Sequence, residues 1–165
     1  MIKILFVCHG NICRSPMAEF VFKNMVKQKG MEDLFYIASA ATSREEIGST
    51  VHHGTRKVLG ELGISTEGKR AVQMTKNDYR EYDYIVVMDQ RNITNINRII
   101  GTDTKKKVSR LLDFTNQPRD IADPWYTDNF ARTYEEVYEG CEALLTVISK
   151  EHRIQRIVSE NKSPN

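Results

Sequence analysis

The sequence predicts an α/β protein in which a four-stranded parallel sheet is flanked by helices. Four short apolar runs alternate with helical patterns along the 165 residues, an order typical of parallel sheets covered on both faces. The first run, residues 2–7, is almost wholly apolar, as expected of a central strand that is buried on both sides. Ligands of such sheets bind beyond the carboxyl ends of the strands, so the turn after residue 7 is a candidate site.

Residues 17–29 predict the first helix, because apolar side chains recur every four positions along one face. We expect Pro16 at its first position, where the missing N–H costs nothing, and Gly30 just beyond its end. Two later helices are expected to begin with capping boxes, at Thr75 and at Thr133. The same patterns predict further strands at 35–38, 84–88 and 108–112, helices at 51–62 and 91–99, and a loop over 113–129.

The length fits one domain, expected over residues 1–153, and a polar tail over 154–165 that we expect to be frayed. A net charge of +2 gives no reason to expect binding to nucleic acid. No apolar stretch approaches the roughly 20 residues that span a bilayer, so membrane insertion is not expected. Because the chain opens directly with a strand and its three cysteines make no disulfide framework, we expect a cytoplasmic protein.

Residues 8–15, here called the phosphate loop, join the first strand to the first helix. Cys8 follows the strand and Arg14 opens the helix, while Gly10 and Asn11 tolerate positive φ. Successive N–H groups in such a turn can form an anion nest beside the positive end of the helix dipole. A thiol there ionises readily, and a guanidinium matches phosphate geometry, which predicts attack by sulfur on a phosphoryl group. The alternative is a structural turn with an inert Cys8 and a surface Arg14.

Residues 6–19, FVCHGNICRSPMAE, resemble the signature of the low-molecular-weight protein tyrosine phosphatases. The resemblance continues in residues 39–43 (SAATS), 84–89 (YIVVMD) and 123–126 (DPWY), and it extends in the family's order to about Lys150. It implies a flavodoxin-like fold and hydrolysis of phosphotyrosine through a cysteinyl-phosphate intermediate. It also implies phosphate, sulfate or vanadate as inhibitory anions.

Hydrolysis of a phosphate ester needs an acid that protonates the leaving oxygen. Asp123 is the candidate, because Pro124 restricts its backbone to extended conformations and it lies in a long loop. Its segment resembles the general-acid loop of the family, although a lone Asp-Pro pair often does no more than open a turn. The expected mechanism is attack by Cys8, stabilisation of the phosphoryl oxygens by Arg14, and acid and then base catalysis by Asp123. No metal or cofactor is expected.

The resemblance assigns supporting roles within the phosphate loop. Asn11 and Ser15 match positions that hold the loop in shape and hydrogen-bond the thiolate, although Ser15 is also a candidate helix cap. For Cys13 the resemblance implies a reversible disulfide with Cys8. An equally good alternative is that Cys13 is only a small buried side chain with no redox role. Cys141 is expected in the core, and His52 and His53 are assigned no chemistry. The expected substrate-binding residues of the loop are His9, Gly10, Asn11, Ile12, Cys13 and Ser15.

Outside the loop, Trp125 and Tyr126 are expected to form an aromatic wall beside the substrate. A walled cleft favours the long phosphotyrosine side chain over phosphoserine. Glu45 stands where well-known family members carry an aromatic residue, so we expect either modest activity or a preference for substrates with basic flanks. Glu45 is accordingly a further expected substrate-binding residue.

The primary expectation is a phosphatase acting on phosphotyrosine-containing proteins. A protein-arginine phosphatase of the same family is the alternative, but a threonine commonly replaces Ile12 in that branch. A thiol-based arsenate reductase is more remote, because no relay cysteine lies between Cys13 and Cys141. A non-catalytic phosphate-binding module is the third alternative, and the joint presence of Cys8, Arg14 and Asp123 argues against it.

Overall fold

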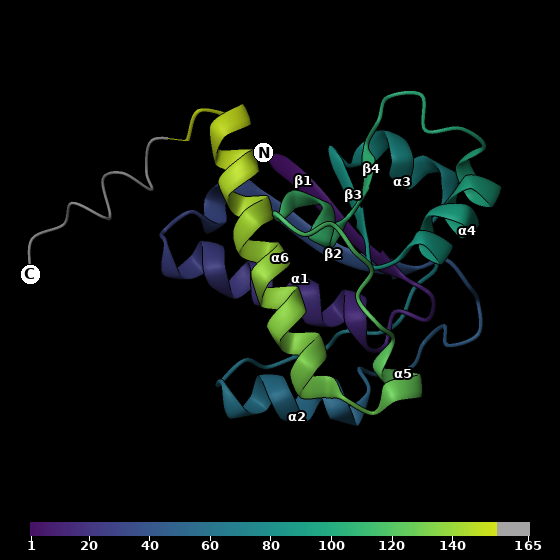
Figure 1. The fold of residues 1–165 in the computed structure, drawn as a ribbon, viewed down its shortest axis with the longest axis vertical. Helices are drawn as coiled ribbons and strands as arrows, with labels where there is room; N and C mark the ends of the chain where they lie inside the picture. Colours follow the sequence, from purple (N-terminus) through teal and green to yellow (C-terminus); the bar gives the residue numbers. More distant parts are fainter. Residues whose placement is uncertain (155–165) are drawn as a thin grey trace, which may run out of the picture.

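The computed structural model describes residues 1–154. Its four-stranded parallel sheet has the order β2-β1-β3-β4 and consists of β1 (Ile2–Cys8), β2 (Phe35–Ala41), β3 (Tyr84–Val87) and β4 (Val108–Arg110) (Figure 1). The predicted fold class, a four-stranded parallel sheet flanked by helices, is confirmed. Of the tail predicted over 154–165, all but Ile154 lies outside the described residues.

Helices cover both faces of the sheet (Figure 1). One face is covered by α1 (Arg14–Gln28) and α6 (Phe130–Glu151), and both of these helices contact α2 (His53–Glu61). The other face is covered by α3 (Lys76–Glu81) and α4 (Gln90–Ile100). The side chains of β1 alternate between the two resulting cores, since neighbouring residues of a strand point to opposite faces. Ile4, Phe6 and Cys8 join the core under α1 and α6, and Leu5 and Val7 join the other.

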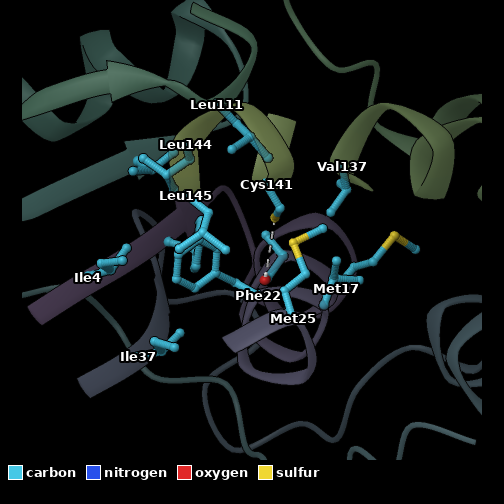
Figure 2. Close-up of a cluster of buried hydrophobic side chains, with 14 of the residues drawn as sticks. Ile4, Met17, Phe22, Met25, Ile37, Leu111, Val137, Cys141, Leu144 and Leu145 are labelled. Atoms are coloured by element: carbon cyan, nitrogen blue, oxygen red, sulfur yellow. Dashed lines mark hydrogen bonds between the residues drawn. The ribbon is translucent and has the colours of Figure 1, made fainter. Parts of the chain in front are cut away.

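The larger core fills the space between the sheet and the helices α1 and α6 (Figure 2). Phe22 is fully buried there, with its ring centroid 5.9 Å from that of Phe6 and 5.5 Å from that of Phe35. Cys141 is also fully buried, and its Sγ lies 3.9 Å from the carbonyl oxygen of Ala18. The expectation that Cys141 is a core residue is therefore confirmed.

Several boundaries differ from the prediction. α1 begins at Arg14, so Pro16 is its third residue rather than its first. A proline is tolerated there because the first four N–H groups of a helix have no partner within the helix. β2 continues to Ala41 because its last residues pair with the end of β1. The additional short elements are η1 (Glu32–Leu34), η2 (Leu111–Phe114) and α5 (Pro124–Thr127), the last within the predicted loop.

The two predicted capping boxes had different outcomes. The box that opens α3 at Thr75 is confirmed. The box at Thr133 was wrong, because α6 begins one turn earlier, where the side chain of Asn129 accepts a hydrogen bond from Arg132 N at 3.0 Å. The Thr133 hydroxyl instead donates to the carbonyl oxygen of Asn129. Across residues 1–154, no helix combines the length and the hydropathy that crossing a bilayer requires.

Packing of α6 against η2 generates a stability prediction. A Cβ atom added at Gly140 would lie 2.4 Å from Leu111 Cγ, closer than real contacts allow. We expect Gly140→Ala to lower the free energy of unfolding by about 1–3 kcal/mol through overpacking. Gly60→Ala is the matched control, because nothing lies within 4 Å of its added Cβ, and it should raise stability by about 0.5–1 kcal/mol. Urea unfolding of both variants checks this, and equal effects would contradict it.

Candidate active site

The phosphate loop lies at the carboxyl end of β1, which is flanked in the sheet by β2 and β3. The carbonyl oxygens of Cys8, His9 and Ile12 accept backbone hydrogen bonds of 2.9, 3.1 and 2.8 Å from segments outside the loop. The backbone N–H groups of residues 9–13 have no acceptor within residues 1–154. The loop therefore keeps a row of unpaired donors, which is the property of an anion nest.

A buried amide holds this loop in shape. Asn11 adopts a left-handed backbone conformation with φ of 59°. Its Nδ2 donates to Ser15 Oγ at 2.8 Å and to Ser39 Oγ at 2.9 Å, and its Oδ1 accepts from Val72 N at 3.2 Å. Ser39 in turn donates to the buried carboxylate of Glu19 at 2.6 Å. These bonds compensate the strain of the left-handed conformation, because they fix the side chain from three directions.

The same network orients the hydroxyl of Ser15 toward the nucleophile candidate. Ser15 Oγ lies 3.0 Å from Cys8 Sγ. Ser15 Oγ accepts a hydrogen bond from Asn11 Nδ2, and its own O–H can donate to the sulfur or to the carbonyl oxygen of Ala40, which is farther away at 3.4 Å. Of the two roles considered for Ser15, the structure favours contact with the thiol, since Ser15 is the second residue of α1 and no side chain caps that helix.

Arg14 is buried beside this sulfur, with its side chain 3% exposed. Its Nη1 donates to Asp89 Oδ2 and to the carbonyl oxygen of Ile121, both at 2.7 Å, while its Nη2 lies 3.5 Å from Asp123 Oδ2. Burial lowers the pKa of Arg14, but the charges of Cys8, Asp123 and Asp89 outweigh it and raise the pKa above its ordinary value. The guanidinium is therefore charged and fixed in direction.

Asp123 divides its two carboxylate oxygens between two tasks. Oδ1 accepts a hydrogen bond from Trp125 N at 3.0 Å and so caps α5. Oδ2 faces Arg14 and is part of a side chain that is 25% exposed. We call residues 123–128 the acid loop. Its short helix ends at Asp128, whose φ of 57° is left-handed. One oxygen thus fixes the carboxylate, and the other faces the site.

The loops enclose a pocket of about 360 Å³, a volume typical of small-molecule sites. Trp125 and Tyr126 form one wall and are 58% and 81% exposed. Asn11 and Ser15 lie beneath the phosphate loop, 1% and 0% exposed, and do not line the pocket. The lining residues are Cys8, His9, Gly10, Ile12, Cys13, Arg14, Glu45, Glu46, Asp123, Trp125 and Tyr126.

Charged side chains also line the pocket. His9 Nε2 lies 2.8 Å from Glu45 Oε2, and the Glu45 side chain is 70% exposed. The neighbouring Glu46 accepts a hydrogen bond from Ser49 Oγ at 2.9 Å. Glu45 therefore does not close the pocket as an aromatic residue would. It places a carboxylate at the entrance.

A family model described as low molecular weight phosphotyrosine protein phosphatase matches residues 3–154. The chain belongs to this family. Its members are phosphatases, so the pocket between the phosphate loop and the acid loop is the candidate active site of an enzyme of this family.

Three relatives illustrate the similarity. Low molecular weight protein-tyrosine-phosphatase YfkJ of Bacillus subtilis (strain 168) is 40% identical over 156 residues, which cover 93% of this chain and 100% of the relative. Its crystal structure matches with a TM-score of 0.88 and 41% identity, and the match covers 92% of this chain and 96% of the YfkJ chain. SP-PTP from Streptococcus pyogenes matches with a TM-score of 0.82, 38% identity and coverage of 93% and 97%. Vibrio vulnificus Wzb, solved in complex with benzylphosphonate, matches with a TM-score of 0.76 and 28% identity. The match covers 87% of this chain and 96% of Wzb.

Several residues that support the site of this phosphatase were not expected from the sequence. Asp89 lies two residues beyond the end of β3, the strand next to β1, so parallel pairing was the signal that could have placed it beside Arg14. Ser39 and Glu19 carried no such signal, because their bond depends on how α1 packs on β2. Glu46 is adjacent to the expected Glu45 and also lines the pocket.

Iodoacetamide near neutral pH should modify Cys8 alone. Burial raises the pKa of Cys13 to about 12, and burial also raises the pKa of Cys141, so both stay protonated and weakly nucleophilic. Intact-mass measurement should find one adduct, and peptide mapping should place it on Cys8. Cys8→Ser should remove the adduct, and labelling of Cys13 at an equal rate would contradict the prediction.

Proposed function

We propose that this phosphatase hydrolyses phosphotyrosine and small aryl phosphates through a cysteinyl-phosphate intermediate. The observation that carries the proposal is the convergence of three groups on one pocket: Cys8 Sγ, the fixed guanidinium of Arg14, and Asp123 Oδ2. The relative Wzb, solved with benzylphosphonate, supports a substrate in which a ring is attached near the phosphorus group.

In the first step the Cys8 thiolate attacks phosphorus, and an S–P bond forms as the bond to the phenolic oxygen breaks. The N–H groups of the phosphate loop and Arg14 stabilise the phosphoryl oxygens, where negative charge is concentrated. Protonated Asp123 gives its proton to the leaving oxygen through Oδ2, the oxygen that does not cap α5. Ser15 donates to the sulfur and stabilises its anionic form.

In the second step Asp123, now a carboxylate, takes a proton from a water molecule that attacks phosphorus. The S–P bond breaks, inorganic phosphate is released and the thiolate is restored. Phosphate, sulfate and vanadate would occupy the same nest as inhibitory anions, because each presents tetrahedral or related oxygens to the loop donors. His9, Gly10, Ile12, Cys13, Trp125 and Tyr126 complete the substrate-binding pocket.

Two features favour phosphotyrosine over the alternatives. Ile12 lines the pocket and adds an apolar surface beside an aromatic ring, whereas the arginine-directed branch commonly has threonine there. An arsenate reductase would need a relay thiol, but Cys141 is fully buried on the core-facing side of α6 and the sequence has only three cysteines. The Cys8–Cys13 disulfide stays a prediction. Both thiols line the pocket, but the raised pKa of Cys13, caused mainly by burial, slows its attack on an oxidised Cys8. The cytoplasmic location also stays a prediction.

Turnover of para-nitrophenyl phosphate tests the proposed function. Cys8→Ser should reduce turnover to background, because the hydroxyl of serine is a far weaker nucleophile than a thiolate. Arg14→Lys should lower kcat by roughly 10²–10³-fold, since it removes preorganised donors from the phosphoryl oxygens. Cys141→Ala is the control, because it removes a thiol of the core and should leave the enzyme active. Full activity of Cys8→Ser, or greater turnover of phosphoarginine than of phosphotyrosine, would overturn the proposal.

Glu45 generates a prediction about substrate choice. With Glu46 it places two carboxylates at the pocket, so phosphopeptides with lysine or arginine flanks should be preferred over acidic ones. Glu45→Ala should reduce the ratio of kcat/KM between the two peptide types by roughly two- to fivefold, the size of one exposed ion pair. Glu61→Ala removes an equal charge from the exposed end of α2 and should change nothing. An unchanged ratio in Glu45→Ala would contradict the prediction.

A further inference from the structure

His52 lies where the phosphate loop, the acid loop and the start of α6 meet. Its backbone N donates to the carbonyl oxygen of Ile12 at 2.8 Å. Its ring is stacked on Phe130, with centroids 5.1 Å apart and planes 9° from parallel, and it meets Trp125 edge-on at 5.6 Å and 76°. A single residue therefore contacts both loops that carry the proposed chemistry.

The hydrogen bonds of His52 define its tautomer. Its Nδ1 accepts from Gly54 N at 3.1 Å and thereby caps α2, so Nδ1 carries no proton and the neutral ring is protonated at Nε2. Burial lowers the pKa of His52, and His53 and Arg56 lower it further, whereas Asp128 and Glu46 act in the opposite direction. Protonation of Nδ1 would place its N–H against the N–H of Gly54, so the hydrogen bond that caps α2 would be lost.

The His52 ring rests on a tight contact between α2 and α6. A Cβ atom at Gly54 would lie 2.5 Å from the Phe130 ring, so the first turn of α2 is in direct contact with the first residue of α6. The ring that His52 presents to Trp125 is thus held by two helices. The acid loop has less support of its own, since α5 has four residues and Trp125 is 58% exposed.

We propose that His52 is a positioning residue: its neutral ring supports Trp125 and thereby sets the place of the Asp123 carboxylate relative to the phosphate loop. The coupling is direct, because Trp125 N is the donor that fixes Asp123 Oδ1. A shift of Trp125 therefore moves the carboxylate whose other oxygen faces the pocket. The inference rests on the proposed role of Asp123 as general acid.

Two substitutions separate the functions of the His52 ring. His52→Asn keeps a side-chain acceptor that can cap α2 but removes the ring beneath Trp125. His52→Phe keeps a ring but removes the acceptor, and it tests whether a ring beneath Trp125 is enough to support Trp125 without the cap of α2. His53→Asn is the matched control, because His53 is exposed and its ring stacks on His52 at 4.3 Å.

The first readout is the dependence of rate on the leaving group. Phenyl phosphate needs the general acid, whereas 2,4-dinitrophenyl phosphate has a leaving group that departs without a proton. His52→Asn should lower kcat/KM for phenyl phosphate by roughly tenfold, a part of the 10²–10⁴-fold that an acid contributes. It should change the value for the dinitrophenyl ester by less than about twofold, whereas Asp123→Asn should show the full loss for phenyl phosphate. Equal losses on both esters, or none, would overturn the inference.

The second readout is the fluorescence of Trp125, the single tryptophan of the chain. An imidazolium beside an indole quenches its emission, so acidification of the wild type should quench Trp125 with a midpoint below the ordinary histidine value of about 6.5. The transition should vanish in His52→Asn and His52→Phe and persist in His53→Asn. An unchanged transition in His52→Asn would overturn the inference. Because fluorescence needs no turnover, it distinguishes this failure from failure of the proposed function, which would appear as an inactive wild type.

Discussion

The ion pair between Arg14 and Asp89 is the interaction on which the site of this phosphatase depends. A guanidinium buried this deeply is tolerated only with close partners, because desolvation of a charge costs several kcal/mol. Asp89 and the carbonyl oxygen of Ile121 supply those partners at 2.7 Å. Since Arg14 opens α1, Asp89 precedes α4 and Ile121 leads to the acid loop, the pair ties together three segments that are distant in sequence. The direction of the guanidinium follows from the fold itself.

Two aspartates use the same arrangement on either side of Arg14. Asp89 Oδ1 accepts from Asn92 N and caps α4, while its Oδ2 binds the guanidinium. Asp123 Oδ1 caps α5, while its Oδ2 faces Nη2 of the same group. Each carboxylate is therefore oriented by the helix that it begins. The cap that begins each helix therefore also orients a carboxylate of the charged site.

The sequence predicts those parts of the molecule that depend on local patterns. The apolar run before Cys8 located the central strand, and the turn after it located the phosphate loop. Two local helix caps were nevertheless missed, although they join residues only two or three positions apart: Asn129 rather than Thr133 begins α6, and Asp123 begins α5 within a predicted loop. Other features depend on contacts between residues that are distant in the sequence. His52 was assigned no chemistry because its contacts with Trp125 and Phe130 join residues more than seventy positions apart. The partners of Asn11 likewise become visible only in three dimensions.

Trp125 and Tyr126 contribute little to the hydrophobic core, since more than half of each side chain is exposed to solvent. Their backbone is held instead by the cap of Asp123 and by the left-handed Asp128 at the end of α5. Exchange of the Tyr126 ring therefore alters the pocket wall with little loss of buried apolar area, whereas exchange of Trp125 also removes its contact with His52. At Tyr126 the scaffold thus separates the residues that keep the chain folded from a residue that shapes the pocket, and this wall can be exchanged at little cost to the stability of the fold.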